Sequence, residues 1–124
     1  MAVAFVKNIG SAQTKVNAET LVITTSASSV AGNTIFVRVD TLAAASSKDC
    51  TDSASNTYIS YSTAGDPRQN IWRADNTLSI ANGGTITITW PLGGGFSAVA
   101  AAADEFSGVK TASALEGSVT TTGT

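Results

Sequence analysis

The chain has little of what most enzymes use for chemistry: its 124 residues include no histidine and one cysteine, and only 13% are charged. Without histidine, the His-dependent catalytic triads are excluded, and zinc and haem lack their usual ligands. Seven scattered Lys and Arg residues against nine Asp and Glu give a net charge of −2, which argues against binding nucleic-acid phosphates. The longest low-polarity run, 98–103, is too short for a membrane span. We therefore expect no enzyme, no cofactor or metal, and neither nucleic acid nor membrane as partner.

The N-terminus lacks the pattern of a secretory signal. Residues 1–9 are interrupted by Lys7 and Asn8, and they contain neither a basic start nor an apolar stretch of sufficient length. We expect a chain that is made in a cytoplasm.

The chain does contain a series of short β-strand patterns bounded by Gly, Asn, Asp or Ser. The clearest, Thr85–Trp90, alternates polar and apolar residues without a slip, as a strand with one buried face does. Short strands with little helix between them are typical of an antiparallel sandwich or barrel. We expect one domain at residues 13–124, preceded by an N-terminal arm or first strand at residues 1–12. Eight strands are predicted, near residues 3–9, 19–26, 34–42, 48–52, 57–62, 69–74, 85–90 and 96–106.

Two segments fit more than one structure. The alanines of 96–106 favour a helix by propensity, but no capping residue opens the run, and the Pro91–Gly95 loop joins it directly to a strand. We predict a strand whose small side chains let another layer approach closely, with a short helix as the alternative. The Thr- and Gly-rich tail, 118–124, fits a strand or disorder.

Carboxylates and the single thiol offer the remaining routes to chemistry. Asp104 and Glu105 are adjacent, so on a strand they point to opposite faces and cannot act together across one glycosidic bond. A buried Glu105 would need a cationic partner, for which Arg73 and Arg38 are the candidates. Cys50 has no partner for an internal disulfide. A buried structural thiol is favoured over an intermolecular bridge or a reactive group.

Other polar and aromatic residues have structural explanations beside their functional ones. Asp49, Asp52 and Asn56 carry oxygens that suit Ca²⁺, but their spacing matches no EF-hand loop, and turn residues that cap backbone amides are favoured. Trp72 and Trp90 suit either the core of a small sandwich or a platform for stacking sugars, and the core is favoured for Trp72.

Five pieces of the chain form a series with a characteristic order and spacing: Ala31–Thr34, Asp52–Tyr58, Ile71–Asn76, Gly84–Thr89 and Glu105–Val109. In this order they resemble a β-sandwich module of bacterial secreted proteins and tailed-phage virion proteins. Ser55 departs from the module, which has a glycine in that turn. The chain also ends soon after Val109, where the module usually continues, so a neighbouring subunit is expected to cover an exposed sheet edge by adding a strand.

The resemblance implies an immunoglobulin-like or jelly-roll sandwich that acts by display and adhesion. We expect a structural virion protein, most concretely a phage capsid decoration (cement) protein, which stabilises the assembled shell by binding only that shell. Its partners would be the major capsid protein or other virion subunits, together with copies of itself, in a trimer by family analogy. The alternatives are a carbohydrate-binding or adhesive module, and a tail or fibre component. The expected contact residues are Ala2, Val3, Phe5, Val6, Gly93, Gly94, Gly95 and Phe96.

Overall fold

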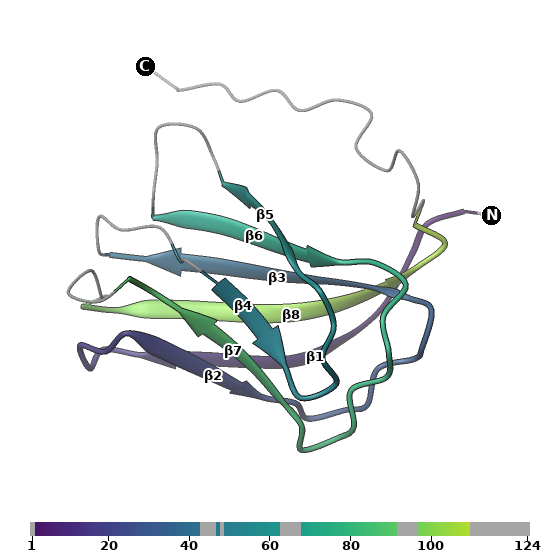
Figure 1. Cartoon of the computed structure of the whole chain (residues 1–124), viewed down its shortest axis with the longest axis horizontal. Coiled ribbons are helices and arrows are strands. Elements are labelled where there is room, and N and C mark those ends of the chain that lie inside the picture. The colour runs from purple at the N-terminus through teal and green to yellow at the C-terminus, as the bar shows by residue number, and fades with distance from the viewer. Residues whose placement is uncertain (1, 43–46, 48, 63–67, 92–96, 110–124) are drawn as a thin grey trace.

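The computed structural model of the chain describes residues 2–42, 47, 49–62, 68–91 and 97–109 (Figure 1). Within these ranges the predicted all-β fold is confirmed, and no helix is long and apolar enough to cross a membrane. The eight strands are β1 (Ala4–Thr14), β2 (Thr20–Thr24), β3 (Thr34–Thr41), β4 (Asp49–Asp52), β5 (Ile59–Ser62), β6 (Gln69–Ala74), β7 (Thr85–Thr89) and β8 (Val99–Ser107).

The strands form two antiparallel sheets that pack as a sandwich (Figure 1). The five-stranded sheet has the order β1-β8-β3-β6-β5, and the three-stranded sheet has the order β2-β7-β4. The pairs β1–β8, β2–β7 and β3–β6 are those of one long hairpin that has been rolled up, which is the jelly-roll arrangement. The order differs from that of immunoglobulin sheets. Only β5 leaves the jelly-roll scheme, because it pairs with β6 and not with β4.

The core lies between the sheets and is made by alternate residues of each strand. Leu21 and Ile23 of β2 point inward, whereas Val22 between them is 47% exposed, as predicted from their alternation. Each fully buried Ile or Val contributes about 1.5–3 kcal/mol to folding by leaving water. The core cluster comprises Ile9, Leu21, Ile23, Ile35, Val37, Val39, Cys50, Trp72, Ile80, Ile86, Ile88, Trp90, Val99, Ala101 and Ala103.

The alanine-rich segment is a strand, so the helix alternative is wrong for residues 99–107. β8 is paired with β1 on one side and with β3 on the other, and these two ladders outweigh the helix propensity of alanine. Ala101 and Ala103 are buried in the core, where their small side chains let the opposite layer approach. Ala100 and Ala102 alternate with them and point to the outside of the sandwich.

β1 is longer than the predicted first strand and continues to Thr14 along the whole length of β8. Irregularities in its register fall between Phe5 and Lys7 and between Asn8 and Gly10. A Cβ on Gly10 would lie 2.8 Å from Cγ2 of Ile23, so β1 approaches β2 more closely here than any larger residue allows.

The loop that contains Ser55 has the backbone of a glycine turn. Ser55 has a φ of 63°, in the left-handed region that glycine enters without steric cost and serine rarely does. The position at which the chain departs from the module it resembles therefore keeps the conformation that a glycine would favour.

Candidate functional site

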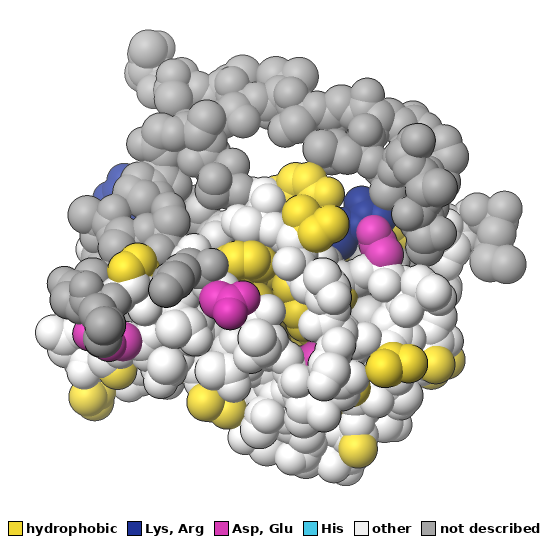
Figure 2. Space-filling view, viewed as in Figure 1, with side chains coloured by type: hydrophobic (Ala, Val, Ile, Leu, Met, Phe, Trp, Pro, Cys, Tyr) yellow, Lys and Arg dark blue, Asp and Glu magenta, His cyan; other side chains and the backbone are white. Residues whose placement is uncertain are grey.

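The two outer faces of the sandwich differ in chemistry. Figure 2 views the molecule from the side on which the three-stranded sheet lies in front, and most of that surface is backbone or side chains that are neither hydrophobic nor charged. Its outward strand positions are mostly threonines, with Val22 and Asp49 among them. Such a face is solvated without charge. The threonines are Thr20, Thr24, Thr51, Thr85, Thr87 and Thr89.

The outer face of the five-stranded sheet instead carries a row of aromatic side chains. The ring of Phe106 on β8 lies edge-on to Phe5 of β1 at 5.6 Å and to Phe36 of β3 at 5.5 Å, between ring centroids. The guanidinium of Arg73 on β6 lies 5.6 Å from the Phe36 centroid, and Asp75 holds it through a 2.8 Å ion pair. These contacts link three aromatic rings and one guanidinium across four strands. We call this set the aromatic row, and its members are Phe5, Phe106, Phe36 and Arg73.

A shallow groove follows β8 on the same face. Its two hollows, of about 550 and 600 Å³, share Gln13, Asp40 and Ala100 in their linings. The small side chain of Ala100 forms the floor, and longer side chains of β1 and β3 rise on either side, among them Arg38. An apolar floor between polar walls is the form that a surface for an extended segment of another chain takes.

Large apolar side chains are exposed around the aromatic row. Phe5 is 60% exposed at the β1 edge, and Ile59 and Ile71 are 55% and 42% exposed on β5 and β6. Ile59 lies opposite Arg73 in the β5–β6 ladder, and Ile71 is two residues from Arg73, so both share its face. Large apolar side chains are therefore exposed at both edges of this sheet, and exposed apolar surface is a mark of interaction sites.

Four of the eight predicted contact residues fall within the described part of the chain, at the start of β1 or just before it. Ala2, Val3, Phe5 and Val6 are all exposed, and Phe5 begins the aromatic row. The predicted glycine loop and Phe96, at 93–96, lie outside the described residues. Sequence reasoning missed the rest of the row, although Ile35-Phe36-Val37 gave a signal: three consecutive apolar residues in a strand put one of them on the outer face.

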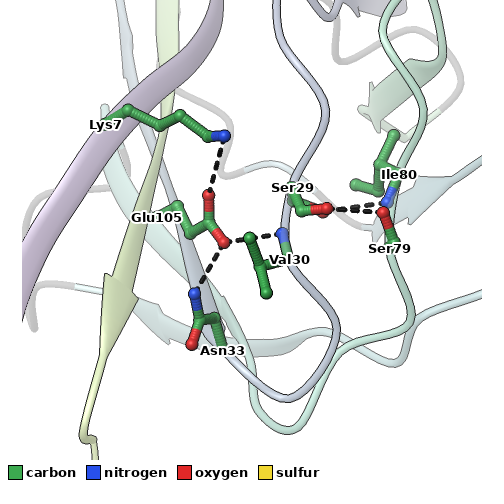
Figure 3. Close-up of polar contacts among 7 residues, drawn as sticks. All are labelled: Lys7, Ser29, Val30, Asn33, Ser79, Ile80 and Glu105. Atoms are coloured by element: carbon green, nitrogen blue, oxygen red, sulfur yellow. Dashed lines mark hydrogen bonds and ion pairs between the residues drawn. The ribbon is translucent and has the colours of Figure 1, made fainter.

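The buried Glu105 organises one end of the sandwich (Figure 3). Its side chain is fully buried, and its Oε1 accepts hydrogen bonds from the backbone N–H of Val30 and from Nδ2 of Asn33, both at 2.7 Å. Its Oε2 lies 3.8 Å from Nζ of Lys7. The carboxylate thereby ties the loop before β3 to β8 and β1. It faces the core, whereas Asp104 lies on the outer face and accepts a hydrogen bond from Asn8, which confirms that the pair points to opposite faces.

The predicted arginine partners of Glu105 are wrong. Arg73 pairs with Asp75, and Arg38 pairs with Asp40 at 3.1 Å. Both arginines occupy outward positions of their strands, so the core-facing Glu105 is out of their reach. The cationic partner of Glu105 is instead Lys7, which lies opposite Glu105 in the β1–β8 ladder.

Asp52 organises the turn after β4, as the turn interpretation predicted. Its Oδ1 accepts hydrogen bonds from the backbone N–H groups of Ala54 (2.9 Å) and Asn56 (3.1 Å). Its Oδ2 accepts from Nδ2 of Asn56 (2.9 Å) and from the Tyr58 hydroxyl (2.7 Å). Both oxygens are thus occupied by donors from the protein. Across the described ranges, no group of three or more His, Cys, Asp and Glu residues is placed to hold a metal ion.

Both tryptophans belong to the core. Trp72 and Trp90 are 6% and 2% exposed, and Nε1 of Trp72 donates a 2.9 Å hydrogen bond to the buried hydroxyl of Ser47. An indole in this position cannot stack on a sugar at the surface. The aromatic surface of the described chain lies with Phe5, Phe36 and Phe106 instead.

Cys50 is a buried thiol, as favoured from the sequence. Burial, together with the nearby carboxylates of Asp52 and Asp49, raises the pKa of Cys50 far above its usual range. Because only the thiolate reacts readily, we expect the folded protein to resist iodoacetamide at neutral pH and the urea-unfolded protein to be alkylated stoichiometrically. Intact mass after timed labelling measures both, and rapid labelling of the folded chain would contradict the buried placement.

Comparisons of the chain with protein-family models, with curated proteins and with solved structures found no match in any of the three.

Proposed function

We propose that the chain is a structural virion protein, a phage capsid decoration (cement) protein that binds the assembled shell through the outer face of its five-stranded sheet. The proposal unites the five resembling sequence pieces with the jelly-roll sandwich and the chemistry of this face. A protein that binds only the assembled shell stabilises that shell by mass action.

The observation that carries the proposal is the exposed apolar surface at the β1 edge. Val3 and Phe5 are 61% and 60% exposed, and the ring of Phe5 contacts Phe106 of the aromatic row. Aromatic anchors at a rigid sheet surface supply most of the binding energy of a protein interface. The Arg38–Asp40 pair beside the groove suits the polar rim of such an interface.

The opposite face gives a matched control for a binding experiment. Val22 is similarly apolar and 47% exposed, but it stands among the threonines of the three-stranded sheet. Replacing Val22 or Phe5 by serine removes exposed apolar surface in each case, from opposite sides of the sandwich.

Phe5→Ser is expected to weaken binding to shells about tenfold or more, because it removes an exposed aromatic anchor, whereas Val22→Ser should bind like the wild type. The measurement is co-sedimentation of purified protein with empty shells of the phage that carries the gene, across a concentration series. Each variant is first shown to unfold at a denaturant concentration close to that of the wild type. Co-sedimentation with isolated tails and not with shells would show that the protein is a tail component. Equal weakening of shell binding by both substitutions would exclude this face as the contact surface.

We propose a closed homo-oligomer, a trimer by family analogy. Light scattering across a dilution series measures its mass, and a monomer at every concentration would rule out the trimer.

A further inference from the structure

The turn at residues 81–84, just before β7, contains the reactive dipeptide Asn82-Gly83. The backbone nitrogen of a residue can attack the side-chain amide of an asparagine before it, and glycine hinders that attack least because it has no side chain. Asn82 and Gly83 are both exposed, and a Cβ on Gly83 would meet no atom within 4 Å. The turn therefore leaves room for the attack and gives access to water.

Hydrogen bonds fix the backbone of this turn. The N–H of Gly84 donates to the carbonyl of Ala81 at 2.9 Å, and Gly83 has a φ of 81°, as the third residue of a type II turn does. The preceding residue, Ile80, is held by Ser29, whose N–H donates to the Ile80 carbonyl at 2.9 Å and whose hydroxyl accepts the Ile80 N–H at 2.8 Å (Figure 3).

Thr25, the residue after β2, binds the turn from the other side and is 2% exposed. Its carbonyl accepts the N–H of Gly83 at 2.8 Å, and its own N–H donates to the carbonyl of Gly84 at 2.9 Å. Its hydroxyl donates to the carbonyl of Ala81 at 2.7 Å. Three groups of one buried residue thus hold the turn against the end of β2.

The contact between Gly83 and Thr25 opposes the reaction of Asn82. The Gly83 nitrogen must lose its proton and move toward Cγ of Asn82 before it can attack. While the turn is bound to Thr25, that proton is shared with a carbonyl oxygen, which is not a base strong enough to remove it, and the nitrogen is held in place. The reaction therefore requires a local opening of the turn.

We infer that Asn82 is a site of spontaneous deamidation, which Thr25 keeps unreactive while the turn is bound. In the open turn, hydroxide takes the proton of the Gly83 nitrogen, which attacks Cγ of Asn82. The Cγ–Nδ2 bond breaks, and ammonia leaves with a proton from water. Water then opens the resulting succinimide ring at one of its two carbonyls, which gives aspartate or isoaspartate. In balance, one carboxamide and one water yield one carboxylic acid and one ammonia.

The modification would make the opening of the turn permanent. In isoaspartate the main chain runs through the side chain and is longer by one atom, so the N–H of Gly83 and the carbonyl of Gly84 no longer fit Thr25 together. The reaction also places a new negative charge beside the threonines of the three-stranded sheet. The inference rests on the fold and is independent of the proposed function.

Peptide mapping after incubation at mildly alkaline pH tests whether the fold protects Asn82. Fragment spectra measure its conversion to the acid, in native buffer and in urea. We expect Asn82 to react at least about tenfold more slowly in the folded chain. Asn76 lies in the same tryptic peptide, 74–110, and serves as an internal reference, because the bulkier Thr77 follows it. Equal rates for Asn82 in both solutions, or no conversion in urea, would overturn the inference.

A substitution at Thr25 tests its role directly. Thr25→Val keeps nearly the same shape but removes the hydroxyl that donates to Ala81, and Asn82 should react about tenfold faster in native buffer. Thr24→Val makes the same change at the exposed neighbouring position, and Ile35→Val weakens the core in the other sheet. Both controls should react like the wild type. An unchanged rate in Thr25→Val, or an equal acceleration in either control, would overturn the role of Thr25.

Discussion

Replacing Glu105 by alanine is expected to lower the free energy of unfolding by about 3–5 kcal/mol, among the largest effects of any single substitution in this chain. The substitution leaves the backbone N–H of Val30 and the amide of Asn33 without their acceptor, and each unsatisfied buried donor costs about 1–3 kcal/mol. It also leaves a cavity where the fully buried side chain stood.

Asp104→Ala is the matched control for Glu105→Ala. It removes the neighbouring carboxylate from the same strand, but that side chain faces outward and accepts one hydrogen bond, from Asn8. Its cost should stay below about 1 kcal/mol. Urea titrations of both variants and of the wild type measure the two costs. Equal costs for the two substitutions would show that Glu105 does not organise this end of the sandwich.

Asp52→Ala is expected to destabilise the fold by about 2–4 kcal/mol, because one carboxylate satisfies two backbone amides and two side-chain donors. Asn56 would lose its anchor in the turn. Asn56 also binds the backbone of Leu78 at both N–H and C=O, so the loss should spread to the segment before β7. The midpoint of urea unfolding measures the cost.

The ionisation of the Tyr58 hydroxyl gives a second test of the contacts of Asp52, because the two side chains are hydrogen-bonded. Burial, and next the hydrogen bond to Asp52, raise the pKa of Tyr58 well above its usual range. Tyrosinate absorbance should therefore show Tyr58 ionising at a lower pH in Asp52→Ala than in the wild type. Asp49→Ala is the control, since Asp49 is exposed and its Oδ1 accepts only the N–H of Cys50 among the described contacts. A Tyr58 titration unchanged by Asp52→Ala would contradict the role given to Asp52.

Strand positions followed from sequence wherever the local pattern and the tertiary structure agree. Thr85–Thr89 alternates strictly and forms β7 within a residue of its predicted end. The second half of β1, by contrast, has small and polar residues from Gly10 to Thr14, and only its pairing with β8 makes it a strand. Local propensity cannot reveal such a strand, because the hydrogen bonds that stabilise it come from residues far away in sequence.

The candidate site was predictable in part. Phe5 was expected to make contacts because it belongs to the apolar start of the chain, and the structure shows it 60% exposed. Its neighbours Phe36 and Phe106 could not be assigned to it, because cross-strand contacts depend on register, and β3 and β8 meet through a jelly-roll crossover. The strand register also explains why the predicted arginine partners of Glu105 were wrong. The sequence pattern places Arg38 and Arg73 on strands, but only the pairing of those strands shows that both side chains face outward.

The stability of the shell with and without this protein tests the account most directly. Empty shells that lack the protein are heated, and their rupture is followed by light scattering, with purified wild-type or Phe5→Ser protein added in increasing amounts. We predict that the wild type raises the rupture temperature until the shell sites are filled, and that Phe5→Ser needs about tenfold more protein for the same rise. A rupture temperature that is unchanged at saturating wild-type protein would contradict a cement function.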